Sequence, residues 1–417
     1  MTSISINSAA ELLRPPDDEM PFVRATRAAE FTTEAGELTI SDGLISSFEG
    51  EADGGAAVQI DASGCAVIPG FVDCHTHLPF AGWRADEFNL KVTGSSYEQI
   101  AQAGGGIKSS AISLEEASDD EVIAQAEALA TEMLEHGTTT FETKSGYGMS
   151  VEGELRALGL AARLGESVVQ QIASTALLAH ALPSGYDVDG WMAEVALMAA
   201  QVADEKSASA LDIYVESVAF DNEQLRKMGE LAKQHGFDLR AHVEQFNANR
   251  SVPVALEVGA RSVDHLACLH PDDLEPLAQS ECAAVLLPGA EFLGDEEVAP
   301  GRALADAGAI TVIATDANPG TSPIVSMPLI IGLAVRRYGW TALEALVAAT
   351  LNPAWLLRCS ETTGSLEIGK RADVVVLDGP VANIAYRFGH NPVAVVICGG
   401  EVVHVRADWQ DRVSGER

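Results

Sequence analysis

Cysteine is scarce in this sequence, and no two cysteines stand at metal-binding spacing. The six residues are scattered, mostly within apolar runs: Cys65, Cys74, Cys268, Cys282, Cys359 and Cys398. The absence of a CxxC pair argues against a cysteine metal site. Such cysteines are typical of reduced, buried side chains in a cytoplasmic protein.

Long hydrophobic runs and basic residues are also lacking. No apolar run approaches the length of a membrane span, and the start Met1-Thr2-Ser3-Ile4-Ser5 does not resemble a signal peptide. Lysine and arginine number 26 against 61 acidic residues, a net charge of -35. This balance argues against a nucleic acid or an anionic membrane as partner. We therefore expect a cytoplasmic protein in which an anionic substrate needs a local basic group.

The chain of 417 residues is long enough for one large barrel and a smaller domain. Residues 37–48 form two short β segments around Asp42-Gly43, which predicts a hairpin. Residues 372–377, 393–398 and 402–403 are similar segments near the other end. We predict one small β domain, residues 1–66 plus 356–417, built from both termini. Residues 12–30 are expected to be an irregular loop.

Residues 67–355 alternate short apolar strands with helical stretches, which predicts βα units and a parallel sheet. The eight expected strands end at His77, Lys144, His180, Glu216, His242, His265, Pro288 and Asp316. Most of these tips are polar, and strand tips form the active-site face of a (β/α)8 barrel. The predicted fold class is therefore α/β, a TIM-like barrel. Helices are expected over 120–135 and over 341–357, the second with a capping box of Thr341 and Glu344.

Three strand tips together predict a metal site. In His75-Thr76-His77 the two imidazoles point the same way, because side chains alternate along an extended chain. A single such pair is more often a hydrogen-bonded part of the core, but His242 and Asp316 stand at matching tips. Three imidazoles and a carboxylate suit one divalent ion, Zn²⁺ or Fe²⁺, which lowers the pKa of bound water.

Other tips offer groups that can move protons or bind substrate. His265 and Asp316 are the candidate acid–base pair. The loop Lys144-Ser145-Gly146-Tyr147-Gly148 offers an ammonium and a phenol, and the turn at 316–323 offers an amide and a hydroxyl, although either can be ordinary turn chemistry. Arg84 can bind a substrate carboxylate through its forked guanidinium, or it can pair with a neighbouring acid on the surface.

These stretches resemble the amidohydrolase superfamily and, within it, the imidazolonepropionase family. The similar segments are residues 69–77, 84–88, 97–106, 144–148, 263–266, 286–290, 316–323 and 388–392, which span nearly the whole chain. The His-x-His pair is common to the superfamily. The Lys144–Gly148 loop and the Asn318-Pro319-Gly320 turn are specific to the family.

The resemblance implies metal-dependent hydrolysis of a cyclic amide. The implied substrate is 4-imidazolone-5-propanoate and the implied product is N-formimidoyl-L-glutamate, in the pathway of histidine degradation. The implied assembly is a homodimer. One metal ion is held by His75, His77, His242 and Asp316. The residues implied to contact substrate or product are Arg84, Tyr147, His180, Gln245, Asn318, Gly320 and Thr321. Glu216 replaces the strand-four lysine of dinuclear relatives, which favours one metal.

Three alternatives stay open at this stage. The segment after Gly106 lacks the arginines usual in the family, so Lys108 can replace them or another cyclic amide can be the substrate. A cytosine-deaminase-like aminohydrolase requires a glutamate three residues after the strand-five histidine to protonate the ring nitrogen. This chain has Gln245, an amide that cannot carry that proton. A non-catalytic scaffold tends to lose metal ligands, and all four are present.

Overall fold

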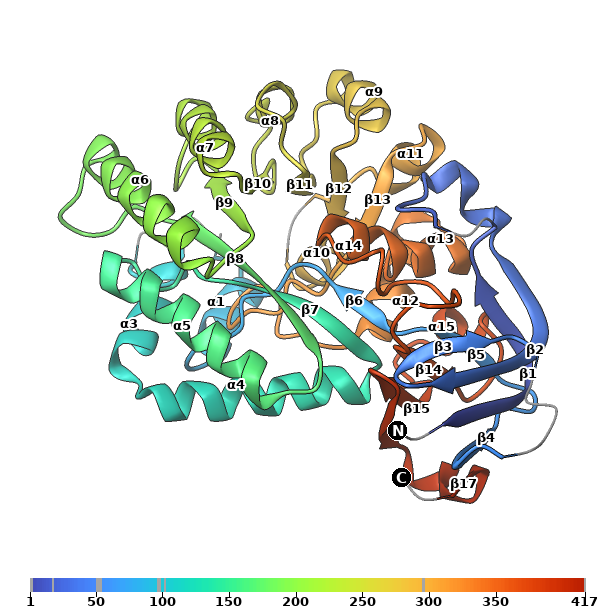
Figure 1. Ribbon diagram of the computed structural model, residues 1–417. Coiled ribbons are helices and arrows are strands. Elements are labelled where there is room, and N and C mark those ends of the chain that lie inside the picture. Colours follow the sequence, from blue (N-terminus) through green and yellow to red (C-terminus); the bar gives the residue numbers. More distant parts are fainter. Residues whose placement is uncertain are drawn as a thin grey trace.

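The computed structural model describes residues 3–16, 19–49, 55–95, 99–100, 103–294 and 297–415. Within these ranges the chain forms a parallel sheet of eight strands and a mixed sheet of nine. Figure 1 shows the mixed sheet at one side of the barrel, with both chain termini beside it.

The parallel sheet contains all eight strands expected from the sequence. They are β6 (Phe71–Asp73), β7 (Thr138–Lys144), β8 (Gln171–Ala179), β9 (Ala210–Val215), β10 (Asp238–Val243), β11 (Ser262–His265), β12 (Ala283–Leu286) and β13 (Ile310–Ile313). Each pairs with its neighbours in sequence order. Beyond the ends of β6 and β13, Thr76 bridges Ala317 in parallel, and the amide of His77 donates to the Ala317 carbonyl at 2.8 Å. The first and last strands thus meet at the carboxyl end, and the predicted TIM-like barrel is confirmed.

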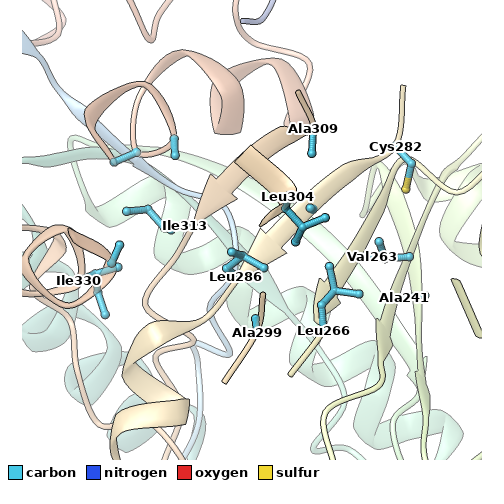
Figure 2. Packing of buried hydrophobic residues seen from close by; sticks show 14 of the residues in the cluster. Ala241, Val263, Leu266, Cys282, Leu286, Ala299, Leu304, Ala309, Ile313 and Ile330 are labelled. Carbon is cyan, nitrogen blue, oxygen red and sulfur yellow. The ribbon is translucent and has the colours of Figure 1, made fainter. Parts of the chain in front are cut away.

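Helices cover the outside of the barrel. The helical segments are α1 (Ala85–Val92), α3 (Ile107–Glu116), α4 (Asp119–Glu135), α5 (Val151–Ser167), α6 (Val188–Glu205), α7 (Asn222–His235), α8 (Ser251–Glu257), α9 (Pro271–Gln279), α10 (Pro288–Phe292), α11 (Gly301–Asp306), α12 (Met327–Tyr338), α13 (Ala342–Val347), α14 (Leu351–Leu356) and α15 (Asn383–Tyr386), with short 3-10 helices η1 (Ala25–Glu30) and η2 (Ala407–Arg412). Figure 2 shows Val263 of β11 and Leu286 of β12 in a buried apolar cluster with Leu304 of α11. Because strand residues alternate, the residues between these apolar ones face the barrel interior.

The mixed sheet joins the two ends of the chain, which confirms the small β domain built from both termini. Its strands are β1 (Ile4–Arg14), β2 (Thr32–Ser41), β3 (Leu44–Ser47), β4 (Val58–Asp61), β5 (Ala66–Pro69), β14 (Val374–Leu377), β15 (Val393–Cys398), β16 (Glu401–Val405) and β17 (Val413–Gly415). Strand β5 pairs with β1 on one side and with β14 on the other. The division of the chain into two domains at residues 66 and 356 stays a prediction.

The apolar run before the His-x-His pair, residues 66–73, contributes one strand to each of the two sheets. Its first part is β5 of the mixed sheet, and its second part is β6 of the barrel, with Gly70 between them. A Cβ atom at position 70 would lie 2.2 Å from the hydroxyl of Thr139 on β7. Only glycine therefore lets the chain pass this close to β7 as it crosses from one sheet to the other.

Two local expectations were wrong. Residues 12–30 are not one irregular loop, because β1 continues to Arg14 and η1 covers residues 25–30; Asp17 and Asp18 lie outside the described residues. The expected helix over 341–357 begins with the predicted capping box but is divided into α13 and α14. The carbonyls of Ala348 and Ala349 accept hydrogen bonds from barrel residues at 2.9 Å. Pro353 has no N–H with which to continue the helix.

Candidate metal centre and catalytic pocket

A narrow pocket opens at the carboxyl ends of the barrel strands, where the sequence predicted the active site. Its lining residues are His77, Arg84, Ile107, Tyr147, His180, Tyr214, His242, Gln245, His265, Asp316, Asn318 and Thr321. Of the predicted site residues, His75 and Gly320 do not line it. His75 is fully buried and in ring contact with His77 and His242, and Gly320 lies against the side chain of Arg84.

Three histidines converge at this pocket. Ligand atoms of His75, His77 and His242 all lie within 4.8 Å of one another. The Asp316 carboxylate Oδ1 is 3.3 Å from Nε2 of His77 and 3.6 Å from Nε2 of His75. His75 and His77 follow β6 in extended chain, His242 is the fifth residue of β10, and Asp316 follows β13. Barrel closure thus brings the His75-His77 pair together with His242 and Asp316, which are far from it in sequence.

Two of these imidazoles are oriented for a metal. The Nδ1 of His75 donates to Asp264 at 2.6 Å, and the Nδ1 of His242 donates to Asp212 at 3.1 Å. Their Nε2 atoms are buried and have no hydrogen-bond partner among the described residues. An imidazole that donates Nδ1–H to a carboxylate presents the lone pair of Nε2, as metal-bound histidines do. The donor set of three imidazoles and a carboxylate therefore fits one divalent ion.

Burial favours the neutral form of His75, His77 and His265. It lowers the pKa of His75 well below the usual value, and the nearby Lys144 ammonium lowers it further. Burial also lowers the pKa of His77 well below the usual value. The pKa of His265 falls to about 3, again chiefly through burial, although Asp316 opposes the shift. Burial raises the pKa of Asp316, against the pull of His265 and His242. Neutral imidazoles keep the lone pairs that metal binding and proton acceptance require.

Lys144 is not a substrate-facing ammonium, contrary to one sequence interpretation. Its Nζ lies 2.8 Å from Glu142 and 2.8 Å from Asp212, and its side chain is completely buried. The sequence analysis did not identify these acidic partners or Arg240. Charged residues at alternate positions of the predicted barrel strands were the available signal, because buried charges need partners.

Arg84 is buried rather than a surface residue. Its side chain lines the pocket and is 7% exposed, and its Nε forms an ion pair with Glu87 at 3.6 Å, which is too long for a hydrogen bond. Neither Nε nor Nη1 has a hydrogen-bond partner in the described part of the chain. A Cβ atom at Gly320 would lie 1.6 Å from Nη2, so a larger residue at this position would displace the guanidinium. A buried guanidinium with open donors is a ready anion-binding group.

The polar groups around the pocket are held in defined orientations. His180 donates Nδ1–H to the Gly146 carbonyl at 3.0 Å, which leaves its Nε2 as an acceptor. The Tyr214 hydroxyl donates to Oε1 of Gln245 at 3.1 Å, so the amide NH2 of Gln245 is the group left to donate. Tyr214 was not predicted, although it stands two residues beyond Asp212 on β9 and so faces the same way.

Hydrogen bonds to side chains stabilise the two loops that flank the pocket. Asn318 Oδ1 accepts from the amides of Gly320 at 2.8 Å and Thr321 at 2.7 Å, which holds the 316–323 turn. Glu154 accepts from the amides of Gly146 and Gly148, both at 2.7 Å. Asn318 is thus a turn-stabilising residue in this structure, and its contact with product stays a prediction.

Two residues weighed in the sequence analysis lie away from the pocket. Glu216 faces Asn247 at 2.9 Å and Asn249 at 2.8 Å. Lys108 is exposed in a separate groove of about 800 Å³ that reaches Tyr147. Tyr97, in one of the family-like segments, lies outside the described residues.

Comparison with known proteins agrees with this geometry. The amidohydrolase family profile matches residues 66–403. An imidazolonepropionase of Herpetosiphon aurantiacus is 43% identical over 85% of this chain and 86% of the relative. That of a Geobacillus species is 34% identical over 97% of this chain and 98% of its own length.

Solved structures share the fold at lower identity. An adenosine deaminase from Xanthomonas campestris with bound zinc has a TM-score of 0.71 at 18% identity, covering 98% of this chain and 94% of its own. A triazine hydrolase variant has a TM-score of 0.76 at 16% identity, covering 96% and 94%. The profile and the sequence relatives identify the group: the chain belongs to the amidohydrolase family and, within it, to the imidazolonepropionases.

Proposed function

We propose that this protein hydrolyses the ring amide of 4-imidazolone-5-propanoate to N-formimidoyl-L-glutamate, a step of histidine degradation. The observation that carries the proposal is the buried Arg84 guanidinium with open donors in the same pocket as the three histidines and Asp316. A substrate with a carboxylate at one end and an amide at the other matches these two features. The names of the sequence relatives support the same reaction.

We propose one ion, Zn²⁺ or Fe²⁺, held by His75, His77, His242 and Asp316. When bound, such an ion polarises a carbonyl and makes water more acidic near neutral pH. Elemental analysis tests the stoichiometry, for which about one ion per chain is expected. A protein purified without metal that turns over at full rate would refute the site.

The substrate contacts follow from the open donors and acceptors of the pocket. Arg84 binds the propanoate carboxylate through its forked N–H groups. The NH2 of Gln245 donates to the carbonyl oxygen of the imidazolone, and Nε2 of His180 accepts from a ring N–H. Tyr147 and Thr321 complete the ring contacts, and Asn318 and Gly320 contact the product.

Proton movement is assigned to His265 and Asp316. Because His265 is neutral in this pocket, it can accept the proton that the attacking water loses as it bonds to the ring carbonyl carbon. It then gives this proton to the ring nitrogen as the C–N bond breaks. Asp316 is the second group placed to hold a proton beside the reacting atoms. Gln245 cannot take this part, since an amide does not exchange protons as an acid or base.

An ultraviolet assay of imidazolonepropanoate loss tests the activity directly. Cytosine and a series of cyclic amides are run beside it under the same metal loading. We expect turnover of imidazolonepropanoate only. Faster deamination of cytosine would favour the aminohydrolase alternative, and faster opening of another cyclic amide would change the substrate.

We also propose that the protein is a cytoplasmic homodimer. Exposed Phe88, Val92 and Phe292 share a groove of about 810 Å³ with polar residues such as Lys91 and Asn247, and these apolar side chains suit a contact with a second copy. All six cysteines are described, and all are free thiols. In the described residues no helix combines the length and apolarity needed to cross a membrane. Sedimentation of the purified protein distinguishes monomer from dimer.

A further inference from the structure

One continuous chain of buried hydrogen bonds connects two of the three histidines beneath the pocket. Asp264 accepts from His75, and it also accepts from Arg240 at 2.9 Å. Arg240 donates to Glu142 at 2.6 Å, and Glu142 accepts from Lys144 at 2.8 Å. Lys144 donates to Asp212 at 2.8 Å, and Asp212 accepts from His242. We call this set of His75, Asp264, Arg240, Glu142, Lys144, Asp212 and His242 the buried ionic network.

Five barrel segments supply the network through the period of two along each strand. Glu142 and Lys144 are two residues apart on β7, and Arg240 and His242 are two apart on β10. Parallel pairing sets Arg240 opposite Asp212 of β9, and His242 opposite Asp264 of β11. The network therefore depends on the register of the barrel strands as well as on residue identity.

The network favours a divalent cation above it. Three carboxylates share two cations, Lys144 and Arg240, so the buried side chains hold excess negative charge. Each cation bridges two carboxylates, and neither contacts an imidazole directly. The third histidine, His77, is outside the network, and its Nδ1 has no hydrogen-bond partner among the described residues.

We propose that Lys144 and Arg240 are positioning residues that join the carboxylates behind His75 and His242 into one unit, so that both imidazoles hold the metal cooperatively. This inference rests on the proposed metal site. Removing Lys144 leaves the buried carboxylate of Asp212 without a cationic partner, and removing Arg240 leaves that of Asp264 without one, while Glu142 keeps the remaining cation. Asp212 and Asp264 then lose the arrangement that keeps Nδ1–H donated and Nε2 directed to the metal.

The first test is the zinc affinity of Lys144→Met, measured by competition with a chromogenic chelator. We expect binding weaker by about 10- to 100-fold, the usual cost of losing a partner behind a metal ligand. Lys370→Met is the matched control. Lys370 is also buried and ion-paired, to Glu367 at 2.6 Å, but it adjoins the mixed sheet through a backbone bond to Ile45.

The outcomes separate this inference from the proposed function. Wild-type protein that binds neither zinc nor iron overturns the metal site and the inference together. If the wild type binds zinc and Lys144→Met binds it with equal affinity, the inference alone is overturned. A similar loss in Lys370→Met would show that any buried ion pair affects zinc binding through stability, and it would also overturn the inference.

A double-mutant cycle between Asp212→Asn and Asp264→Asn tests the cooperativity and does not depend on the folding of Lys144→Met. Residues of one hydrogen-bonded network show non-additive effects. We expect the loss of zinc affinity in the double variant to differ from the product of the single losses by more than about twofold. Agreement with the product would mean that the two carboxylates orient their histidines independently, which contradicts the proposal.

Discussion

Two residues of the pocket are held in backbone conformations that side chains rarely adopt. His265 has φ of 82°, and Asp316 has φ of 53°, both in the left-handed region that favours glycine. Such conformations persist only where the surrounding structure enforces them, and they concentrate at functional sites. Both residues are the ones to which we assign proton movement. Their strain therefore agrees with a functional role.

The assignment of proton transfer to His265 rather than to Gln245 is testable with single substitutions. His265→Ala should lower kcat by about 10²- to 10⁴-fold, because it removes an acid–base group. Gln245→Ala should affect kcat less, and Gln245→Glu should keep part of the activity since it preserves shape and an acceptor. Steady-state kinetics at saturating imidazolonepropanoate measure both. A larger fall in kcat for Gln245→Ala, with substrate binding intact, would contradict the assignment to His265.

Arg84 and Gly320 form a second residue-scale pair. Arg84→Met should raise KM by about 10- to 150-fold, the loss of one charge-assisted contact of roughly 1.5–3 kcal/mol. Gly320→Ala should raise KM in the same direction, because its Cβ displaces the guanidinium. Lys108→Met is the control, since Lys108 is exposed in the separate groove. If Lys108→Met had the larger effect on KM, the anion would bind in that groove instead.

At the scale of single elements, the capping box of α13 is a local device that the sequence alone revealed. Thr341 Oγ1 accepts from the Glu344 amide at 3.2 Å, and the Glu344 carboxylate accepts from the Thr341 amide at 2.6 Å. Arg302 also donates to Glu344, at 2.8 Å. Burial alone raises the pKa of Glu344, but Arg302 and Thr341 outweigh it and hold the pKa below the usual 4.5.

Two variants test this cap by urea unfolding. Thr341→Ala should lower the free energy of unfolding by about 1 kcal/mol near neutral pH. Glu344→Gln should also destabilise there, because a carboxyl whose folded pKa is lowered stabilises the protein above pH 4.5. That contribution is lost as the pH falls through the folded pKa, so the difference from wild type should shrink in acid. A Glu344→Gln deficit independent of pH would show that the charge of Glu344 does not contribute.

At the scale of the whole molecule, metal binding should be linked to folding, because the four ligands come from β6, β10 and β13 ends that only the closed barrel brings together. Metal that binds the folded state stabilises it by about 2.7 kcal/mol at a free concentration 100 times Kd. Chelation should therefore lower the Tm, and added zinc should restore it. His75→Ala and Asp316→Ala should lose both turnover and this metal-dependent shift, as calorimetry with and without zinc can show. Full turnover by metal-free Asp316→Ala would refute the mechanism.

The sequence by itself determined the local features of this protein. Alternation along each strand set the paired direction of His75 and His77, and strand ends marked His242, His265 and Asp316. Apolar runs at both ends predicted the mixed sheet, and residue types predicted the cap of α13. These features depend on the two-residue period of strands, on the 3.6-residue period of helices and on neighbours a few residues away in sequence.

Only the tertiary structure decided which side chains meet across strands. Lys144 and Tyr147 stand three residues apart in one motif, yet Lys144 lies in the buried ionic network and Tyr147 lines the pocket. The partnership of Arg240 with Glu142, and the division of the helix after α13, likewise depend on barrel closure. Strand register and closure are set by contacts between residues far apart in sequence, and no local period contains that information.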